Sequence, residues 1–263
     1  MQRCQTGLNE VPRYPVLWDL AFRLGISILD RRPRSFKKDA ADCVTRLRPP
    51  LQVLGKEHIP KTGPCLVTVN HYARPGFHAW WIALGISAVL PCDVHWVITA
   101  AWTYPDSLRA HTITPVTRWL LRRIAETYDF TSMPPMPPDP DEVQARAEAV
   151  RRILRFARNN MSPVIGLAPE GMDMAEGKLS MPPPGVGRFI AHLTDLGLPI
   201  LPVGAFESGN RFCLGFGLPF LLNIPPNLGP EEMDWAASHA VMLHIARLLP
   251  PGLRGDFNKE LPA

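Results

Sequence analysis

The sequence predicts an α/β fold with a mixed, mostly parallel sheet flanked by helices. From residue 51 onward, short apolar runs of strand length alternate with longer stretches whose apolar residues recur at helical spacing. The chain has 263 residues, of which 46% are hydrophobic and 20% charged, so it can bury a substantial core. Its 30 prolines cluster between these stretches and mark the loops.

The first fifty residues, 1–50, are expected to form an N-terminal amphipathic helical region. Residues 14–30 place apolar side chains at helical spacing, which predicts an amphipathic helix. Its apolar face could pack on the domain, or lie at a membrane surface with Trp18 and Arg23 near the lipid headgroups. The basic stretch RRPRSFKK at 31–38 suits either a solvated face or contact with anionic lipid.

An α/β domain is expected over residues 51–222. Its predicted strands are 51–55, 65–69, 94–98, 163–168, 199–205 and 211–217. Its predicted helices are 75–90, 113–126, 141–160 and 185–197. Pro75 suits the first turn of the helix at 75–90, and Pro202 inside the strand at 199–205 indicates an edge strand or a bulge.

Residues 223–263 are expected to be a C-terminal helical extension packed on the same domain, with a helix at 231–249. The start of the chain lacks the apolar core of a signal peptide, and no segment offers about 18 uncharged apolar residues for a spanning helix. The five cysteines form neither a CxxC pair nor a Cys/His cluster, which favours a reducing cytoplasm and argues against a metal site.

A net charge of +4 suits an anionic membrane surface or a phosphorylated substrate, and it is too weak to indicate nucleic acid. The sequence contains no P-loop and no G-x-G-x-x-G at a strand–helix turn. It also lacks the G-x-S-x-G elbow of a serine hydrolase.

Two short motifs follow predicted buried strands. Asn70-His71 ends the strand at 65–69, and Pro169-Glu170-Gly171 ends the strand at 163–168. Ligands bind at the carboxyl ends of parallel strands in such sheets, so His71 and Glu170 are expected to meet at one edge. Each motif alone could be structural, because a histidine in a turn or a glutamate at a turn often only forms hydrogen bonds.

In this order, the motifs resemble those of the glycerolipid acyltransferase superfamily, to which 1-acylglycerol-3-phosphate acyltransferase belongs. Asn70-His71 resembles the start of its N-H-x4-D block, and Pro169-Glu170-Gly171 with the later Gly185 resembles its F-P-E-G-T-R-S block. The strand at 199–205 resembles its fourth block. The resemblance covers about residues 50–220.

The resemblance implies that His71 is a general base, and Glu170, expected at the same edge of the sheet, is the second predicted catalytic residue. His71 would take a proton from an acceptor hydroxyl, which attacks an acyl-CoA or acyl carrier protein thioester. Asn70, Arg74, Gly76, Pro169, Gly171 and Arg188 are the expected substrate-binding residues. The implied activity is acyl transfer to a lysophospholipid or related lipid in phospholipid biosynthesis, at the cytoplasmic face of a membrane, without cofactor or metal. A non-catalytic protein that binds lipid or an acyl thioester is the alternative.

The sequence departs from this family at two positions. Gly76 stands where the family has the aspartate that orients the histidine, and Asp173 stands where it has an arginine implied to hold the acceptor phosphate. These changes disfavour lysophosphatidic acid and suit a neutral, sugar or amine acceptor. Arg74 and Arg188 could restore an anion site or form structural ion pairs.

Several groups could orient His71 in place of the missing aspartate. Glu170 and Asp173 are expected at the same edge of the sheet, Asp93 is more remote, and His78 is either a displaced catalytic group or a helix histidine. The apolar stretch that contains Trp80 and Trp81 suits a buried helix, an acyl-chain groove or a membrane interface.

Overall fold

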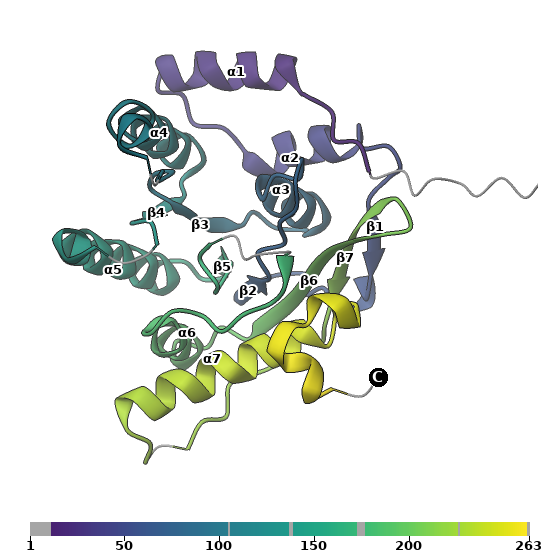
Figure 1. The fold of residues 1–263 in the computed structure, drawn as a ribbon, viewed down its shortest axis with the longest axis vertical. Helices are drawn as coiled ribbons and strands as arrows, with labels where there is room; N and C mark the ends of the chain where they lie inside the picture. The colour runs from purple at the N-terminus through teal and green to yellow at the C-terminus, as the bar shows by residue number, and fades with distance from the viewer. Residues whose placement is uncertain (1–11, 105, 137–138, 173–176, 226, 262–263) are drawn as a thin grey trace, which may run out of the picture.

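The protein is a three-layer α/β structure in which one seven-stranded sheet lies between two layers of helices (Figure 1). The computed structural model describes residues 12–104, 106–136, 139–172, 177–225 and 227–261. In spatial order the strands are β1 (Gln52–Leu54), β7 (Arg211–Phe216), β6 (Ile200–Ser208), β2 (Cys65–Val69), β5 (Val164–Leu167), β3 (His95–Thr99) and β4 (Thr131–Met133).

The sheet is mixed and mostly parallel, which confirms the predicted fold class. Strands β6, β2, β5, β3 and β4 all run in one direction. Strand β7 pairs with β6 in the opposite direction, and β1 pairs parallel to β7. The carboxyl ends of the five parallel strands therefore meet at one edge of the sheet, where a ligand site is expected.

Helices cover both faces of the sheet (Figure 1). One layer contains α1 (Trp18–Leu29), α2 (Phe36–Val44), α3 (Trp80–Val89) and α4 (Ser107–Tyr128). The other layer contains α5 (Val143–Asn159), α6 (Val186–Asp195) and α7 (Pro230–Ala246). Among the described residues, no helix combines the length and the apolar character needed to cross a membrane.

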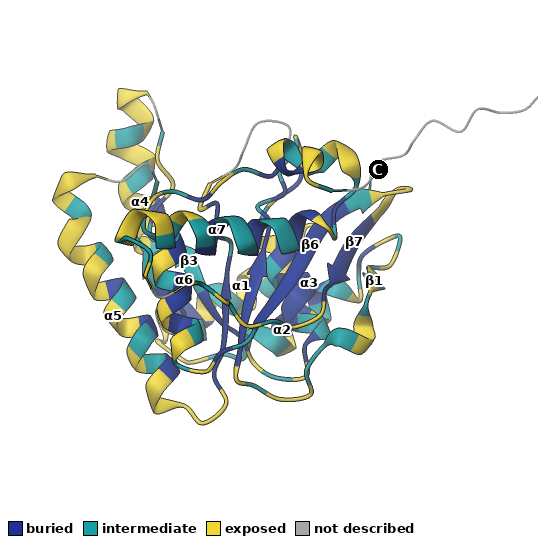
Figure 2. Ribbon diagram, turned by 90° about the horizontal axis from the view of Figure 1, so that it is seen from below, coloured by how far each residue is buried: buried dark blue, intermediate teal, exposed yellow. Residues whose placement is uncertain are grey.

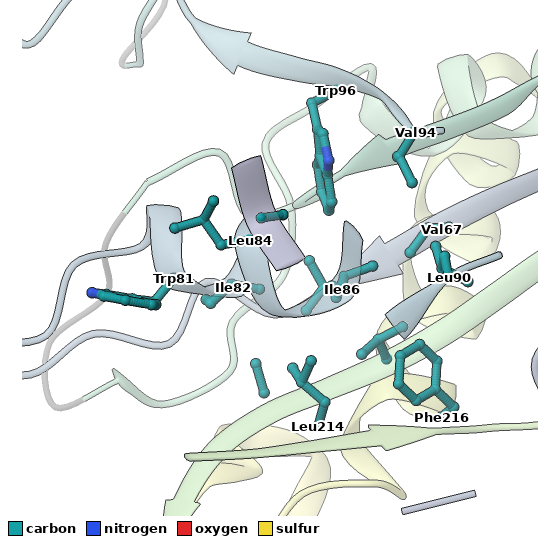
Figure 3. Close-up of a cluster of buried hydrophobic side chains, with 14 of the residues drawn as sticks. Val67, Trp81, Ile82, Leu84, Ile86, Leu90, Val94, Trp96, Leu214 and Phe216 are labelled. Carbon is teal, nitrogen blue, oxygen red and sulfur yellow. The ribbon is translucent and has the colours of Figure 1, made fainter. Parts of the chain in front are cut away.

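The core lies on the two faces of the central strands, because both faces are covered by helices. All five residues of β2 are buried, and the strands form the darkest part of the burial view (Figure 2). On the face towards α3, Ile86 packs among Val67, Leu214 and Phe216, and Trp81 lies at the other end of the same cluster (Figure 3). This packing fixes β2 and the residues that follow it.

The predicted helix at 75–90 begins later than expected, at Trp80. Residues 74–77 instead form a turn in which the N–H of Phe77 donates to the carbonyl of Arg74 at 3.0 Å. Pro75 and Gly76 occupy the central positions, and Gly76 has a φ of +79°. This is the pattern of a type II turn, whose third residue cannot be helical. The strand before it therefore leads into a loop, so the assignment of Pro75 to a first helical turn is wrong.

Pro202 does not lie at an edge, because β6 is flanked by β7 and β2. Its pairing with β2 is regular, with Pro202 opposite Thr68. On the other side, the antiparallel ladder begins one residue later, at Val203 and Phe216. The carbonyl of Pro202 accepts from the N–H of Gly217 beyond the end of β7. The proline thus sits in an irregular stretch between this ladder and the isolated antiparallel pairing of Ile200 with Phe220.

One α-helix and one strand were not expected from the sequence. Helix α2 occupies part of the basic stretch, and its N-cap Ser35 accepts a hydrogen bond from the N–H of Lys38. Arg34 in the same stretch pairs with Asp39 through bonds of 2.8 and 2.5 Å, so it is not simply solvated. Strand β4 is only three residues long, too short to give an alternating pattern.

Candidate active site

The site lies where β2 and β5 end side by side. From β2 the chain continues through α3 towards β3, and from β5 it continues through α6 towards β6. These two connections leave in opposite directions along the sheet and on opposite faces (Figure 1). In open α/β sheets, ligands bind at the carboxyl ends of the strands at such a switch point. His71 follows β2 and Glu170 follows β5, so both motifs reach this point.

Asn70 anchors the end of β2 to β6. Its side chain is fully buried. The side-chain amide donates to the carbonyl of Ala205 at 2.9 Å, and its oxygen accepts from the N–H of Ala205 at 2.7 Å. The amide therefore extends the pairing of the two strands by one more step. It fixes the point from which His71 leaves the sheet, and its polar atoms are both occupied by this structural role.

Glu170 joins the two loops of the site. Its turn is closed by a bond of 3.1 Å from the N–H of Gly171 to the carbonyl of Ala168, with Pro169 and Gly171 at positions that such turns favour. Gly171 has a φ of +70°. The Glu170 side chain is only 3% exposed, so this short turn carries the carboxylate into the interior.

The Glu170 carboxylate accepts hydrogen bonds from both sides. One oxygen accepts from the backbone N–H of His71 at 2.7 Å. The other accepts from the backbone N–H and the hydroxyl of Ser180, at 2.9 and 3.2 Å. Burial raises the pKa of Glu170, whereas these hydrogen bonds and the nearby His71 act in the opposite direction. Glu170 thus holds the backbone of His71, and the structure brings the two predicted residues together.

The other groups considered for orienting His71 are placed differently. Asp93 precedes β3, so it lies at the amino edge of the parallel strands, opposite the site, where its carboxylate approaches the hydroxyl of Ser35. His78 is exposed and stacks on Trp80, with ring centroids 4.2 Å apart. Trp81 is buried in the core. Asp173 lies outside the described residues.

Arg74 forms a structural ion pair with Glu207, which was the alternative to a role in substrate binding. Its Nη2 donates to Glu207 Oε1 at 2.7 Å, and its Nε donates to Oε2 of the same carboxylate. The hydroxyls of Tyr14 and Tyr72 donate to this carboxylate at 2.6 and 3.1 Å. Burial and the Glu207 carboxylate raise the pKa of Tyr72 to about 12. The pair ties the loop after β2 to the end of β6.

Gly76 offers no side chain, and it lies with Pro75 at the exposed tip of its turn. Its positive φ belongs to a region in which residues with a Cβ are disfavoured. A Cβ built there would come within 3.4 Å of Nη1 of Arg74. The backbone of this loop is therefore adapted to glycine at the position where the family has aspartate.

Gly185 and Arg188 lie at the start of α6, and a carboxylate from α7 already occupies this helix end. Asp234 accepts from the N–H of Gly185 at 2.7 Å and from the N–H of Arg188 at 2.9 Å. The side chain of Arg188 is exposed. The backbone of these residues serves to join α6 to α7.

Ser180 and Glu207 belong to the site but were not singled out from the sequence. Ser180 lies within the loop rich in proline and glycine between β5 and α6, and Glu207 lies near a hairpin turn. Neither has a motif that indicates its partner. The loop of Ser180 also packs closely on the loop after β2, because a Cβ at Gly177 would lie 2.6 Å from the carbonyl oxygen of Ala73.

Comparison with known proteins gives one family match. A family model described as Acyltransferase matches residues 50–205, which is more than half of the chain. Among solved structures, the chain is similar to the crystal structure of the 1-acyl-sn-glycerophosphate (LPA) acyltransferase PlsC from Thermotoga maritima, with 16% identity, 88% of each chain covered and a TM-score of 0.46. No match was found among curated proteins.

Proposed function

The chain belongs to the acyltransferase family, and from this premise we propose that it transfers a fatty acyl group from an acyl thioester to the hydroxyl of a lysophospholipid or related lipid. The donor is acyl-CoA or acyl carrier protein. The observation that carries the proposal is the meeting of His71 and Glu170 at the switch point between β2 and β5. The matched residues 50–205 include both motifs.

His71 acts as the general base in this proposal. Its imidazole takes the proton of the acceptor hydroxyl while the oxygen attacks the thioester carbonyl carbon. The C–S bond then breaks, and the imidazolium returns the proton to the leaving thiolate. The products are an ester and a free thiol, and no covalent enzyme intermediate is needed.

Glu170 supports this step by holding the His71 backbone in place. Its carboxylate accepts the His71 N–H, and Asn70 fixes the preceding residue to β6. Positioning of a reacting group contributes strongly to rate, because misplacement by about 1 Å can cost on the order of 100-fold. We therefore assign Glu170 a positioning role towards the base.

The test is thioester release from acyl-CoA in the presence of lysolipid acceptors, with wild type beside His71→Ala. Loss of a general base is expected to lower kcat by about 100-fold or more. His78→Ala is the matched control, because His78 lies in the same loop but is exposed and stacks on Trp80. Equal loss in both variants, or no loss in His71→Ala, would contradict the role of His71 as base.

The alternative function is binding of lipid or acyl thioester without turnover. The observation that favours it is Gly76, since its exposed turn has no carboxylate to orient the imidazole. Binding of acyl-CoA without thioester release, unchanged in His71→Ala, would support this alternative.

Contact with a membrane surface is the second part of the proposal. On α1, the side chains of Trp18, Phe22 and Leu29 are 77%, 70% and 76% exposed and share one helical stripe. Helix α1 lies in the outer part of its layer beside α4, which exposes Trp119 (Figure 1). Arg31 and Arg32 follow α1 after its C-cap Asp30, which forms an ion pair with Arg32. An outward apolar stripe next to basic residues suits the interface of an anionic bilayer.

Trp18→Ser is therefore expected to weaken sedimentation with vesicles that contain anionic lipid. Removing one interfacial tryptophan should lower the partition coefficient by about tenfold, because its apolar area no longer enters the bilayer. Trp235→Ser is the control, since Trp235 is 60% exposed but lies on α7 in the opposite layer. Equal sedimentation of both variants and wild type would contradict docking through α1.

A further inference from the structure

The position of the Glu170 carboxylate depends on a loop that has no regular secondary structure of its own. Ser180 donates both its N–H and its hydroxyl to one oxygen of Glu170. It lies among residues 178–183, which belong to neither a helix nor a strand. A segment without its own hydrogen-bond ladder keeps its place through contacts with its neighbours. Those contacts therefore set how the carboxylate meets the N–H of His71.

One neighbour of this loop is the C-terminal segment (residues 250–257), which follows α7 in short helical turns. The N–H of Leu179 donates to the carbonyl of Leu253 at 2.9 Å. Gly255 has a φ of +56°, and a Cβ built on it would lie 2.0 Å from the carbonyl oxygen of Leu179. The two backbones are thus in direct contact, and an approach this close requires glycine.

Buried side chains hold the C-terminal segment against the rest of the protein. Leu179 and Phe257 are both buried and belong to one hydrophobic cluster with Ile245 and Leu249. The ring centroids of Phe257 and His239, which lies on α7, are 5.6 Å apart. Because close-packed interiors transmit displacement, the segment can act as a fixed support for the loop.

We propose that the C-terminal segment positions His71, through Leu179 and Ser180, and thereby sets the rate of acyl transfer. This inference rests on the proposed role of His71 as general base. The contact at Gly255 places Leu179 and hence the next residue, Ser180. Ser180 in turn places the Glu170 carboxylate, which accepts the N–H of His71 at 2.7 Å. A shift of the loop would reach the base, and misplacement by about 1 Å can cost on the order of 100-fold in rate.

The decisive variant is Gly255→Ala, compared with Gly197→Ala. The added Cβ at position 255 meets the Leu179 carbonyl, whereas Gly197, with a φ of +87°, has nothing beyond its chain neighbours within 4 Å. Both variants carry the strain of a positive φ, and only the first displaces the loop. We expect Gly255→Ala to lower kcat for thioester release by about tenfold with KM nearly unchanged, because the support acts on the base and not on substrate binding. Equal kcat in the two variants would contradict the inference.

The backbone amide of His71 gives a second readout, which does not depend on activity. The chain has eight histidines, so labelling the backbone nitrogen of histidine gives few amide signals, and His71→Ala identifies that of His71. An N–H that donates to a carboxylate forms a short, strong hydrogen bond, which shifts its proton signal downfield. The signal should move upfield in Gly255→Ala and stay in place in Gly197→Ala. An unmoved signal in Gly255→Ala would overturn the inference.

The two readouts separate this inference from the proposed function. If the wild type releases no thiol from acyl-CoA with any acceptor, acyl transfer fails, and the amide signal still decides the positioning of His71. Phe257→Leu replaces Gly255→Ala if that variant does not fold. It removes buried volume from the cluster that holds Leu179, so the same changes are expected on a smaller scale. A folded Phe257→Leu protein with the wild-type amide signal and kcat would contradict the inference.

Discussion

Asn70 and Glu170 show how single polar side chains position a site built on loops. Both are almost fully buried, and the side chains of both form hydrogen bonds with backbone groups of a neighbouring segment. Buried polar groups in proteins are nearly always paired, and here the pairing also sets the position of His71 between them. Neither hydrogen bond could be predicted from the sequence, because the partner of Asn70 lies 135 residues away and the partner of Glu170 lies 99 residues away.

A buried histidine far from the site makes stability depend on pH. His95 on β3 is bonded through Nε2 to the hydroxyl of Thr131 at 2.8 Å and stacks on Phe156. Burial lowers its pKa from 6.5 to about 4, while the charges of Asp129 and Arg152 act in opposite directions. His95 is therefore protonated near pH 6.5 in the unfolded chain, but only near pH 4 in the folded chain.

The stability linked to His95 is fully present above pH 6.5 and is lost as the pH falls towards 4. Between these two pH values, the free energy of unfolding falls by about 1.4 kcal/mol for each pH unit. In His95→Gln the urea midpoint should fall less between pH 7.5 and pH 5 than in wild type. His78→Gln is the control, because His78 is exposed. Parallel loss of stability in wild type and His95→Gln would refute this assignment.

At the scale of elements, the turn at 74–77 separates the candidate base from α3. Its positive φ at Gly76 disfavours any residue with a Cβ. We expect both Gly76→Asp and Gly76→Ala to lower the free energy of unfolding by about 1 kcal/mol. Gly76→Asp should show no higher kcat than Gly76→Ala, because position 76 is exposed.

Chemical denaturation and thioester-release kinetics on these two variants provide the measurement. The alanine variant isolates the backbone strain, and the aspartate adds only a carboxylate. A clear gain in kcat specific to aspartate would show that the loop can bring position 76 to the imidazole, against the geometry of the turn.

At the scale of the whole molecule, α7 is part of the core of the α/β unit. Val241, Met242 and Ile245 are fully buried, and α7 packs on α6 and β6. The contact with α6 is close, since a Cβ at Gly187 would lie 2.0 Å from the carbonyl oxygen of Asp234. The domain boundaries at residues 50 and 222 remain predictions, but this packing suggests that the chain unfolds as one unit.

Met242→Ala should therefore destabilise the entire protein by about 2–5 kcal/mol, through loss of buried volume. Tryptophan fluorescence and circular dichroism should report one common transition, shifted to lower denaturant. Met161→Ala is the matched control. Met161 is 100% exposed, so this substitution should change the free energy of unfolding by less than about 0.5 kcal/mol. A sheet transition that stays at the wild-type midpoint would mean that α7 is an independent unit.

The alternation of strands and helices could be predicted from the sequence because it depends on neighbours. Apolar runs and helical spacing are local signals, and they located most strands to within two residues. The same locality explains the errors. Strand β4 is too short for a pattern, α2 lay in a stretch judged by its charge, and the Pro75-Gly76 turn resembled a helix start.

The sequence by itself determined the family, the α/β fold and the two motifs that form the candidate site. The tertiary structure alone decided what those residues contact. It places the Glu170 carboxylate in a hydrogen bond with the backbone N–H of His71. It also pairs Arg74 with Glu207, which lies 133 residues away in the sequence. The physical reason is that a charged side chain in an interior must find a partner, and the order of strands in the sheet determines which partners are within reach.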